Sequence, residues 1–167
     1  MTDPWQRELR DFLLIAGYAV FLGPVAGLIW WQVAPKQTQQ SMTLLLNGSA
    51  APFHLTIDAD VWFLLVAALA GLVTALVVAL LRAAGPGAVA GLAIGSAAAG
   101  VVADRVGYLA ERGHTLAAMK AAGVAPGAID LLDFKVRALG VIVAWPMAAL
   151  LVYMAALAVL DRYRSLP

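Results

Sequence analysis

The amino-acid sequence predicts an all-α membrane protein with four transmembrane helices. Hydrophobic residues account for 63% of its 167 residues and charged residues for only 13%, about half the charged fraction of a typical soluble domain. Four apolar runs come close to the ~20 residues that a helix needs to cross a bilayer. These runs cover residues 12–33, 61–81, 86–103 and 138–160. We therefore expect residues 1–167 to form a single transmembrane domain.

The rest of the composition excludes several classes of protein. The formal net charge is only +1, so the chain lacks the basic surface with which nucleic-acid-binding proteins attract phosphates. The chain contains no cysteine, which excludes disulfides, thiolate catalysis and cysteine-ligated metal sites.

The first run, residues 12–33, is predicted to be an uncleaved membrane anchor. Arg7 and Arg10 precede it, and it ends at Trp30-Trp31 instead of a small-residue cleavage site. A secretory signal peptide is the alternative, but the apolar region of a signal peptide is shorter, about 7–15 residues.

The second and third runs carry small residues at every fourth position, which places these residues on one face of each helix. Helices gain no hydrophobic attraction from one another in lipid, so small-residue faces hold them together by close packing. Only residues 82–85 separate the two runs, and we expect an antiparallel hairpin with stripe against stripe. The predicted packing residues are Ala67, Gly71, Ala75 and Ala79 in the second run and Gly87, Gly91, Gly95 and Ala99 in the third.

The fourth run contains Pro146, which removes a backbone donor and should bend the helix. Trp145 lies about two turns into this run and is expected to pack against helices or lipid. The other tryptophans near the ends of the runs, Trp30, Trp31 and Trp62, are expected to form an aromatic belt at the outer interface.

Four spans place both termini on the same side of the membrane. The arginines before the first run, and the short basic turn after the second, favour cytoplasmic termini. The totals on the two sides, five and six basic residues, do not separate the two orientations. We predict a multi-pass protein of the cell inner (plasma) membrane with cytoplasmic termini.

The first extracytoplasmic loop, residues 35–60, is the most polar part of the chain. Asn47-Gly48 lies between two short strand-like runs, of which the second covers residues 53–57. An Asn-Gly pair between such runs indicates a turn. We expect a small β-like hairpin or an ordered cap on the helix ends.

The second extracytoplasmic loop, residues 107–137, has helical character. Residues 108–122 resemble a helix that Gly123 interrupts, and residues 129–136 show amphipathic helical spacing. The segment is expected either to lie in the membrane interface or to cover the end of the bundle as a connector.

No ionisable residue lies near the middle of an apolar run, where it would indicate proton or ion transport. Ser96 is the polar residue deepest in the third run. It has no histidine base at similar depth, so intramembrane proteolysis is disfavoured. We expect its hydroxyl to bond a carbonyl of its own helix or a neighbouring helix.

Polar residues gather at the outer ends of the runs, namely His54, Asp58, Asp60, Glu111 and His114. They could ligate a metal ion or serve an enzyme acting on lipid-linked substrates. Their spacing matches no metal-binding motif, and solvated ion pairs at helix ends are the simpler interpretation. We predict no catalytic residue, no cofactor and no metal ion.

Two stretches of the sequence resemble a family of small four-span membrane proteins from actinobacteria, known only as a domain of unknown function. One runs from Ile57 through Asp58-Ala59-Asp60-Val61-Trp62 into the third apolar run. The other contains Arg137-Ala138-Leu139-Gly140 and Trp145-Pro146, and together they cover about half of the chain. The resemblance implies an inner-membrane protein of a high-GC Gram-positive bacterium. It marks Arg137, Trp145 and Pro146 as a structural or partner-contact site and implies no activity.

These observations lead to three functional hypotheses. The first is a non-catalytic accessory subunit, or an assembly or stabilising factor, of a larger membrane or cell-envelope complex. Its partners would be the lipid bilayer and other membrane-protein subunits. The second is a small transporter or lipid-handling protein that acts as a homo-oligomer. An enzyme that uses the outer polar residues is the third.

Overall fold

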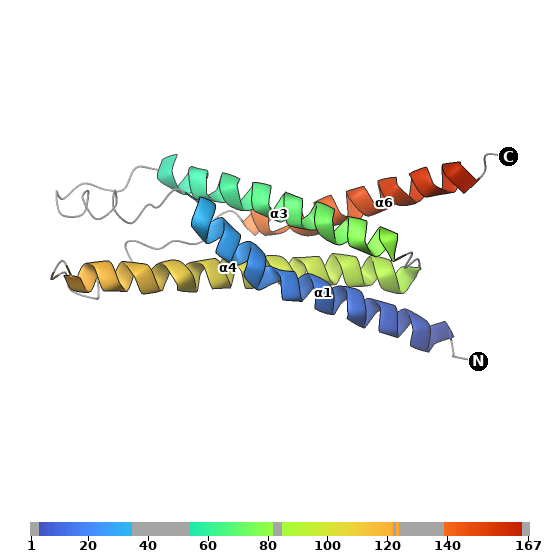
Figure 1. Cartoon of the computed structure of the whole chain (residues 1–167), viewed down its shortest axis with the longest axis horizontal. Helices are drawn as coiled ribbons and strands as arrows, with labels where there is room; N and C mark the ends of the chain where they lie inside the picture. The colour runs from blue at the N-terminus through green and yellow to red at the C-terminus, as the bar shows by residue number, and fades with distance from the viewer. Residues whose placement is uncertain (1–3, 35–53, 82–84, 122, 124–138, 165–167) are drawn as a thin grey trace.

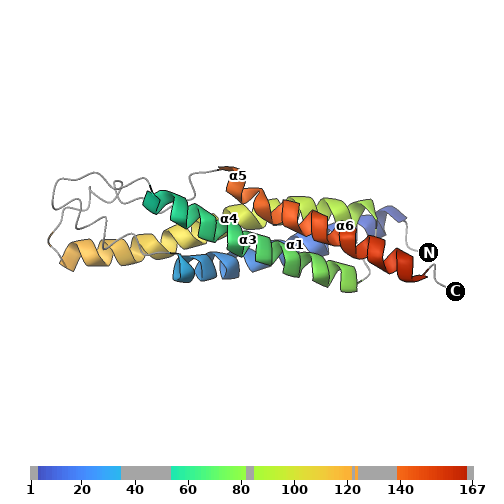
Figure 2. The ribbon, with the colours of Figure 1, turned by 90° about the horizontal axis from the view of Figure 1, so that it is seen from above.

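The computed structural model describes residues 4–34, 54–81, 85–121, 123 and 139–164. Within these residues the fold is entirely helical and contains no strand. The helices form an elongated bundle and run roughly along its long axis (Figures 1 and 2). They are α1 (Pro4–Val33), α3 (His54–Leu80), α4 (Pro86–Ala121), α5 (Leu139–Ile142) and α6 (Ala144–Arg164).

Three of these helices are long and apolar enough to cross a membrane. They are α1, the Ala59–Leu80 part of α3, and α4. The apolar part of α6, Ala144–Val159, is shorter. The chain is therefore a multi-pass membrane protein.

The helices associate as two parallel pairs, α1 with α4 and α3 with α6 (Figure 1). Successive contacts along the first pair advance together: Gly91 lies on Phe12, Gly95 on Ala16 and Gly27 on Ala103. In the second pair, both helices run toward the end of the bundle that holds the chain termini. The two pairs run in opposite directions.

The second and third runs are antiparallel, as expected of a hairpin, but the expected packing of stripe against stripe is wrong. The two helices, α3 and α4, are consecutive in the chain but share few contacts, whereas α4 packs mainly on α1. A short turn brings only the ends of two helices together. Each small-residue stripe accepts whichever helix fits it best, and here the stripe of α4 faces α1 while Gly71 of α3 faces α6.

The third predicted run ends at residue 103, but α4 continues without a break to Ala121. The charged residues Asp104 and Arg105 follow the apolar run, but charged residues do not by themselves end a helix. The helix ends where Gly123 takes a positive φ of 67° and donates its N–H to the carbonyl of Lys120 at 3.3 Å, a common helix C-terminus.

The second strand of the predicted β-like hairpin is also wrong, because His54 begins α3. Five alternating residues fit the first turns of a helix as readily as a short strand. The rest of that hairpin, residues 35–53, lies outside the described residues, as do Arg137 and the amphipathic stretch 129–136.

The fourth predicted run is divided at Val143 into α5 and α6. Proline has no N–H and its ring clashes with the carbonyl four residues earlier, which here belongs to Ile142. The helix resumes with a hydrogen bond from the Met147 N–H to the Val143 carbonyl at 3.1 Å. The expected bend at Pro146 therefore takes the form of a break one turn before it.

Candidate functional site

The start of α4 is fixed by a carboxylate from α1. Gly85, with a φ of 133°, accepts the first backbone hydrogen bond of the helix, from the Val89 N–H at 3.3 Å. The Gly87 N–H then donates to Oε2 of Glu8 at 2.6 Å. A carboxylate is favourable here because the helix N-terminus carries partial positive charge and unpaired N–H groups.

From that point the glycines of α4 let the α1 backbone approach closely. A Cβ placed on Gly91 would lie 2.8 Å from the Phe12 carbonyl oxygen, and one on Gly95 would lie 2.5 Å from the Cα of Ala16. Further along, the small residues of α1 take over this role, with Gly23 against Ala99 and Gly27 against Ala103. Such close approach supplies the van der Waals attraction between helices in lipid.

The second pair has one tight point, at Gly71. A Cβ at this position would lie 2.6 Å from the carbonyl oxygen of Trp145 in α6. One turn further, Thr74 donates to the Ala70 carbonyl at 2.6 Å and accepts the indole N–H of Trp145 at 3.4 Å. The other predicted packing residues of α3, Ala67, Ala75 and Ala79, are buried in the core.

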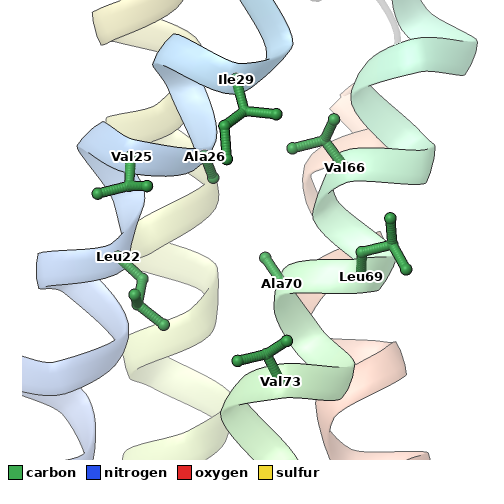
Figure 3. Close-up of a pocket in the computed structure, with 8 residues that line it drawn as sticks. All are labelled: Leu22, Val25, Ala26, Ile29, Val66, Leu69, Ala70 and Val73. Atoms are coloured by element: carbon green, nitrogen blue, oxygen red, sulfur yellow. The ribbon is translucent and has the colours of Figure 1, made fainter.

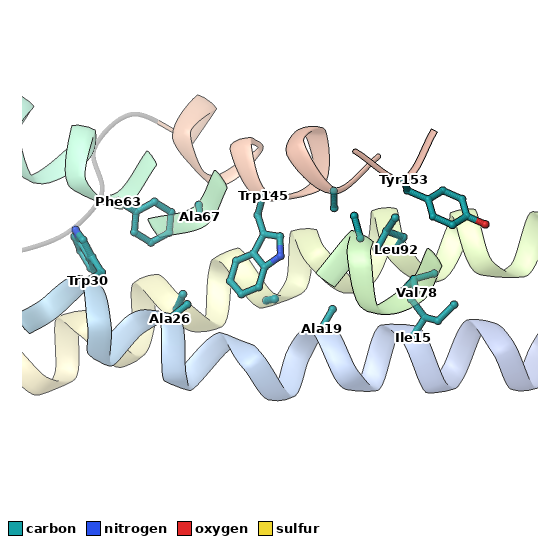
Figure 4. Packing of buried hydrophobic residues seen from close by; sticks show 14 of the residues in the cluster. Ile15, Ala19, Ala26, Trp30, Phe63, Ala67, Val78, Leu92, Trp145 and Tyr153 are labelled. Carbon is teal, nitrogen blue, oxygen red and sulfur yellow. The ribbon is translucent and has the colours of Figure 1, made fainter. Parts of the chain in front are cut away.

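Trp145 and Pro146 are not surface residues. Trp145 is 0% exposed, and its indole points from α6 into the middle of the bundle (Figure 4). Pro146 is buried as well. Of the two alternatives for these residues, the structural role fits and the partner contact is wrong, because a side chain enclosed by its own chain offers no surface to a partner.

Trp30 joins the helices at the level where α1 ends, toward the end of the bundle opposite the chain termini. Its indole N–H donates to the Ala59 carbonyl at 3.0 Å, and its ring meets Phe63 edge-on with centroids 5.0 Å apart. The ring also lies directly on Gly107 of α4, where a Cβ would collide with it. Trp30 thus joins α1, α3 and α4 at one level.

Trp31 contacts the polar residues of α4 at the same end. Its indole N–H donates to Oε2 of Glu111 at 2.8 Å, and its ring lies 5.0 Å from the His114 ring at a tilt of 37°. Glu111 is only 6% exposed. The indole N–H groups of Trp30 and Trp31 both donate to atoms of other helices in the same chain, so the expected aromatic belt is corrected for these two residues. Trp62 is 40% exposed.

The structure brings some of the candidate polar residues together but not as a metal centre. Glu111 and His114 share the Trp31 contact, and Asp60 is partly buried on α3. Among the described residues no three His, Cys, Asp or Glu side chains lie close enough to hold a metal ion. Ser96 is buried, and in the described part its hydroxyl has no hydrogen-bond partner, so the expected bond to a carbonyl is wrong.

An apolar groove lies between α1 and α3, where the two helix pairs meet loosely (Figure 3). It encloses about 240 Å³. Ala26 and Ala70 lie between larger residues on its two sides, and their short side chains leave the space open. The lining residues are Leu22, Val25, Ala26, Ile29, Val66, Leu69, Ala70 and Val73.

The last third of α4 extends past the described end of α1 (Figure 1). Thr115 and Met119 are buried on one side of this extension, whereas Leu109, Arg112 and Leu116 are exposed on another. The sequence did not predict this continuous extension, because the charged residues after the third run indicated a loop with a separate helix.

Comparison with protein-family models, curated proteins and solved structures finds no match to this chain.

Proposed function

We propose that this protein is a non-catalytic integral membrane subunit that stabilises or assembles a larger membrane or cell-envelope complex. The observation that carries the proposal is the continuous helix α4, which is longer than a membrane is thick. Its 36 residues span about 54 Å at 1.5 Å per residue, against about 30 Å for a hydrocarbon core.

Helix α4 is held by contacts at several levels along its length. Glu8 holds its first turn, the glycine contacts with α1 hold its middle, and Trp31 holds Glu111 where α1 ends. A helix restrained in this way keeps its direction as it leaves the membrane. A rigid projection of this kind suits a protein that positions another subunit.

In the proposed topology, residues 138–160 form a fourth span that is broken at Val143, and both termini are cytoplasmic. The end of α4 then projects on the extracytoplasmic side of the plasma membrane.

The test is purification of the tagged full-length chain from its native membrane in a mild detergent. We expect different membrane-protein chains to co-purify in fixed stoichiometry. Gly95→Leu should reduce their recovery because it separates α1 from α4. Gly17→Leu is the matched control, since a Cβ at Gly17 meets no atom within 4 Å. A chain that purifies alone from both backgrounds would refute the proposal.

The groove between α1 and α3 favours a second candidate, a lipid-handling protein. Its apolar lining and volume of about 240 Å³ suit a single hydrocarbon chain. Native mass spectrometry should then detect one retained lipid, and Ala26→Leu with Ala70→Leu should displace it by filling the groove. Leu28→Phe is the control, because Leu28 is exposed on α1 outside the groove.

A further inference from the structure

One face of α4, where the helix leaves the hydrocarbon core, alternates cations with leucines. The five positions are spaced by three or four residues, so they lie on one stripe of the helix, about 22 Å long at 1.5 Å per residue. Leu109 is 63% exposed and Leu116 is 39% exposed, and the three cations are exposed as well. The cation–leucine stripe consists of Arg105, Leu109, Arg112, Leu116 and Lys120.

The acidic residues of the same segment are turned away from this stripe. Glu111 is buried and bonded to Trp31, and Asp104 is partly buried. Arg112 donates to the Tyr108 hydroxyl at 3.0 Å, with its guanidinium 5.9 Å from the centre of that ring. The stripe therefore presents positive charge in a partly fixed geometry, which lowers the entropy lost on binding.

The direction of the stripe limits what can cover it. It follows the axis of a helix that leaves the membrane, so only Arg105 at its base lies at the level of the lipid headgroups. A second copy of the chain would bring an identical positive stripe against it, and like charges in contact are unfavourable. The two exposed leucines are seven positions apart and remain in contact with water when nothing covers them. This spacing suits packing against the apolar residues of another helix.

We propose that the cation–leucine stripe is a docking site for an acidic amphipathic helix of a partner protein, outside the hydrocarbon core. Carboxylates at spacings of three or four residues would pair with Arg105, Arg112 and Lys120. Apolar residues between them would cover Leu109 and Leu116. This inference rests on the proposed function, since it gives the chemistry of the subunit that α4 positions.

The test uses the full-length chain in nanodiscs of zwitterionic phosphatidylcholine and three synthetic helical peptides. One peptide carries glutamates and leucines on a single face, the second has lysines in place of the glutamates, and the third has the acidic composition in scrambled order. Fluorescence anisotropy at low and moderate salt gives each Kd. We expect the first peptide to bind at least about tenfold more tightly than the others, with an affinity that falls as salt screens the charges.

Variants of the stripe complete the test. Arg112→Glu with Lys120→Glu, and separately Leu109→Gln with Leu116→Gln, should each weaken binding by about tenfold, equivalent to about 1.4 kcal/mol. Arg10→Gln is the control, since Arg10 is an exposed cation near the start of α1. Thermal unfolding of each variant checks that the bundle is intact. Equal binding of all three peptides, or binding that the stripe variants leave unchanged, would overturn the proposal.

A photo-crosslinking residue at Leu116 in the native membrane provides the second readout. Capture of a protein segment with carboxylates along one helical face supports the proposal, whereas capture of a second copy or of phospholipid alone overturns it. If different chains still co-purify with the stripe variants in unchanged stoichiometry, the docking site is wrong and the accessory function stands. If the chain purifies alone, the accessory function itself fails.

Discussion

The carboxylate of Glu8 in α1 accepts a hydrogen bond from the backbone N–H of Gly87 in the first turn of α4, over 2.6 Å. This contact joins residues 79 positions apart and neutralises part of the positive end of α4. It also sets the register of the α1–α4 pair, because the contacts of Gly91 and Gly95 follow at four-residue intervals.

Glu8→Ala should therefore lower stability. Removing a side chain that caps a helix N-terminus costs about 0.5–2 kcal/mol, and the lost charge adds to this through the helix dipole. Glu8→Gln should be intermediate, since the amide oxygen can still accept the hydrogen bond. The measurement is the midpoint of thermal unfolding in detergent, with the exposed neighbour Gln6→Ala as a control that should not change it.

Gly95→Leu should separate α1 from α4, not α3 from α4. The new side chain would start 2.5 Å from the Cα of Ala16, where backbone and not a flexible side chain must move. We expect a loss of about 1–3 kcal/mol, typical of overpacked sites, or failure to assemble. Gly17→Leu adds the same side chain in open space and should be neutral. Equal stability of the two variants in thermal unfolding would contradict the α1–α4 contact.

Thr74 and Trp145 should behave as a coupled pair in a double-mutant cycle. Trp145→Phe removes the indole N–H, and Thr74→Val removes the hydroxyl that accepts it at 3.4 Å. We expect a coupling of about 0.6 kcal/mol, the average for hydrogen bonds between membrane helices. Trp145→Ala should cost about 3–5 kcal/mol because it opens a large cavity. Strict additivity of the first two variants would show that this hydrogen bond contributes nothing.

Single-cysteine labelling should report the proposed orientation. The chain has no cysteine of its own, and Gly113 is exposed with no atom within 4 Å of an added Cβ. Gly113→Cys should react with a membrane-impermeant maleimide in intact cells. Gln6→Cys, near the start of α1, should react only after the cells are permeabilised. The reverse pattern would place the end of α4 in the cytoplasm and contradict the proposed topology.

The small-residue stripes show which part of the helix packing the sequence can predict. Gly91, Gly95 and Gly71 are buried where a close approach of backbones occurs, yet their partners are not the ones that adjacency in the chain suggested. A stripe of glycine and alanine indicates that some backbone comes close. Nothing in its spacing says which one, because the complementary surface is on another helix.

The candidate site shows the same limit. Leu109, Arg112 and Leu116 have helical spacing in the sequence, but only an unbroken α4 aligns them with Arg105 on one projecting face. The pairing of Trp31 with Glu111 depends on two residues 80 positions apart, and no local pattern indicates it. Trp30 and Trp31 fit a membrane-interface belt by position, whereas their hydrogen bonds show that they hold helices together.

The sequence by itself determined that this protein is a multi-pass helical membrane protein, because hydropathy and run length depend only on local composition. It also predicted a bend at Pro146 and the end of a separate loop helix at Gly123, because proline and glycine act on their own stretch of backbone. Only the tertiary structure decided that α1 pairs with α4 and α3 with α6, and that α4 continues as one helix past the described end of α1. Those features arise from shape complementarity between distant segments, which exists only once the helices are packed together.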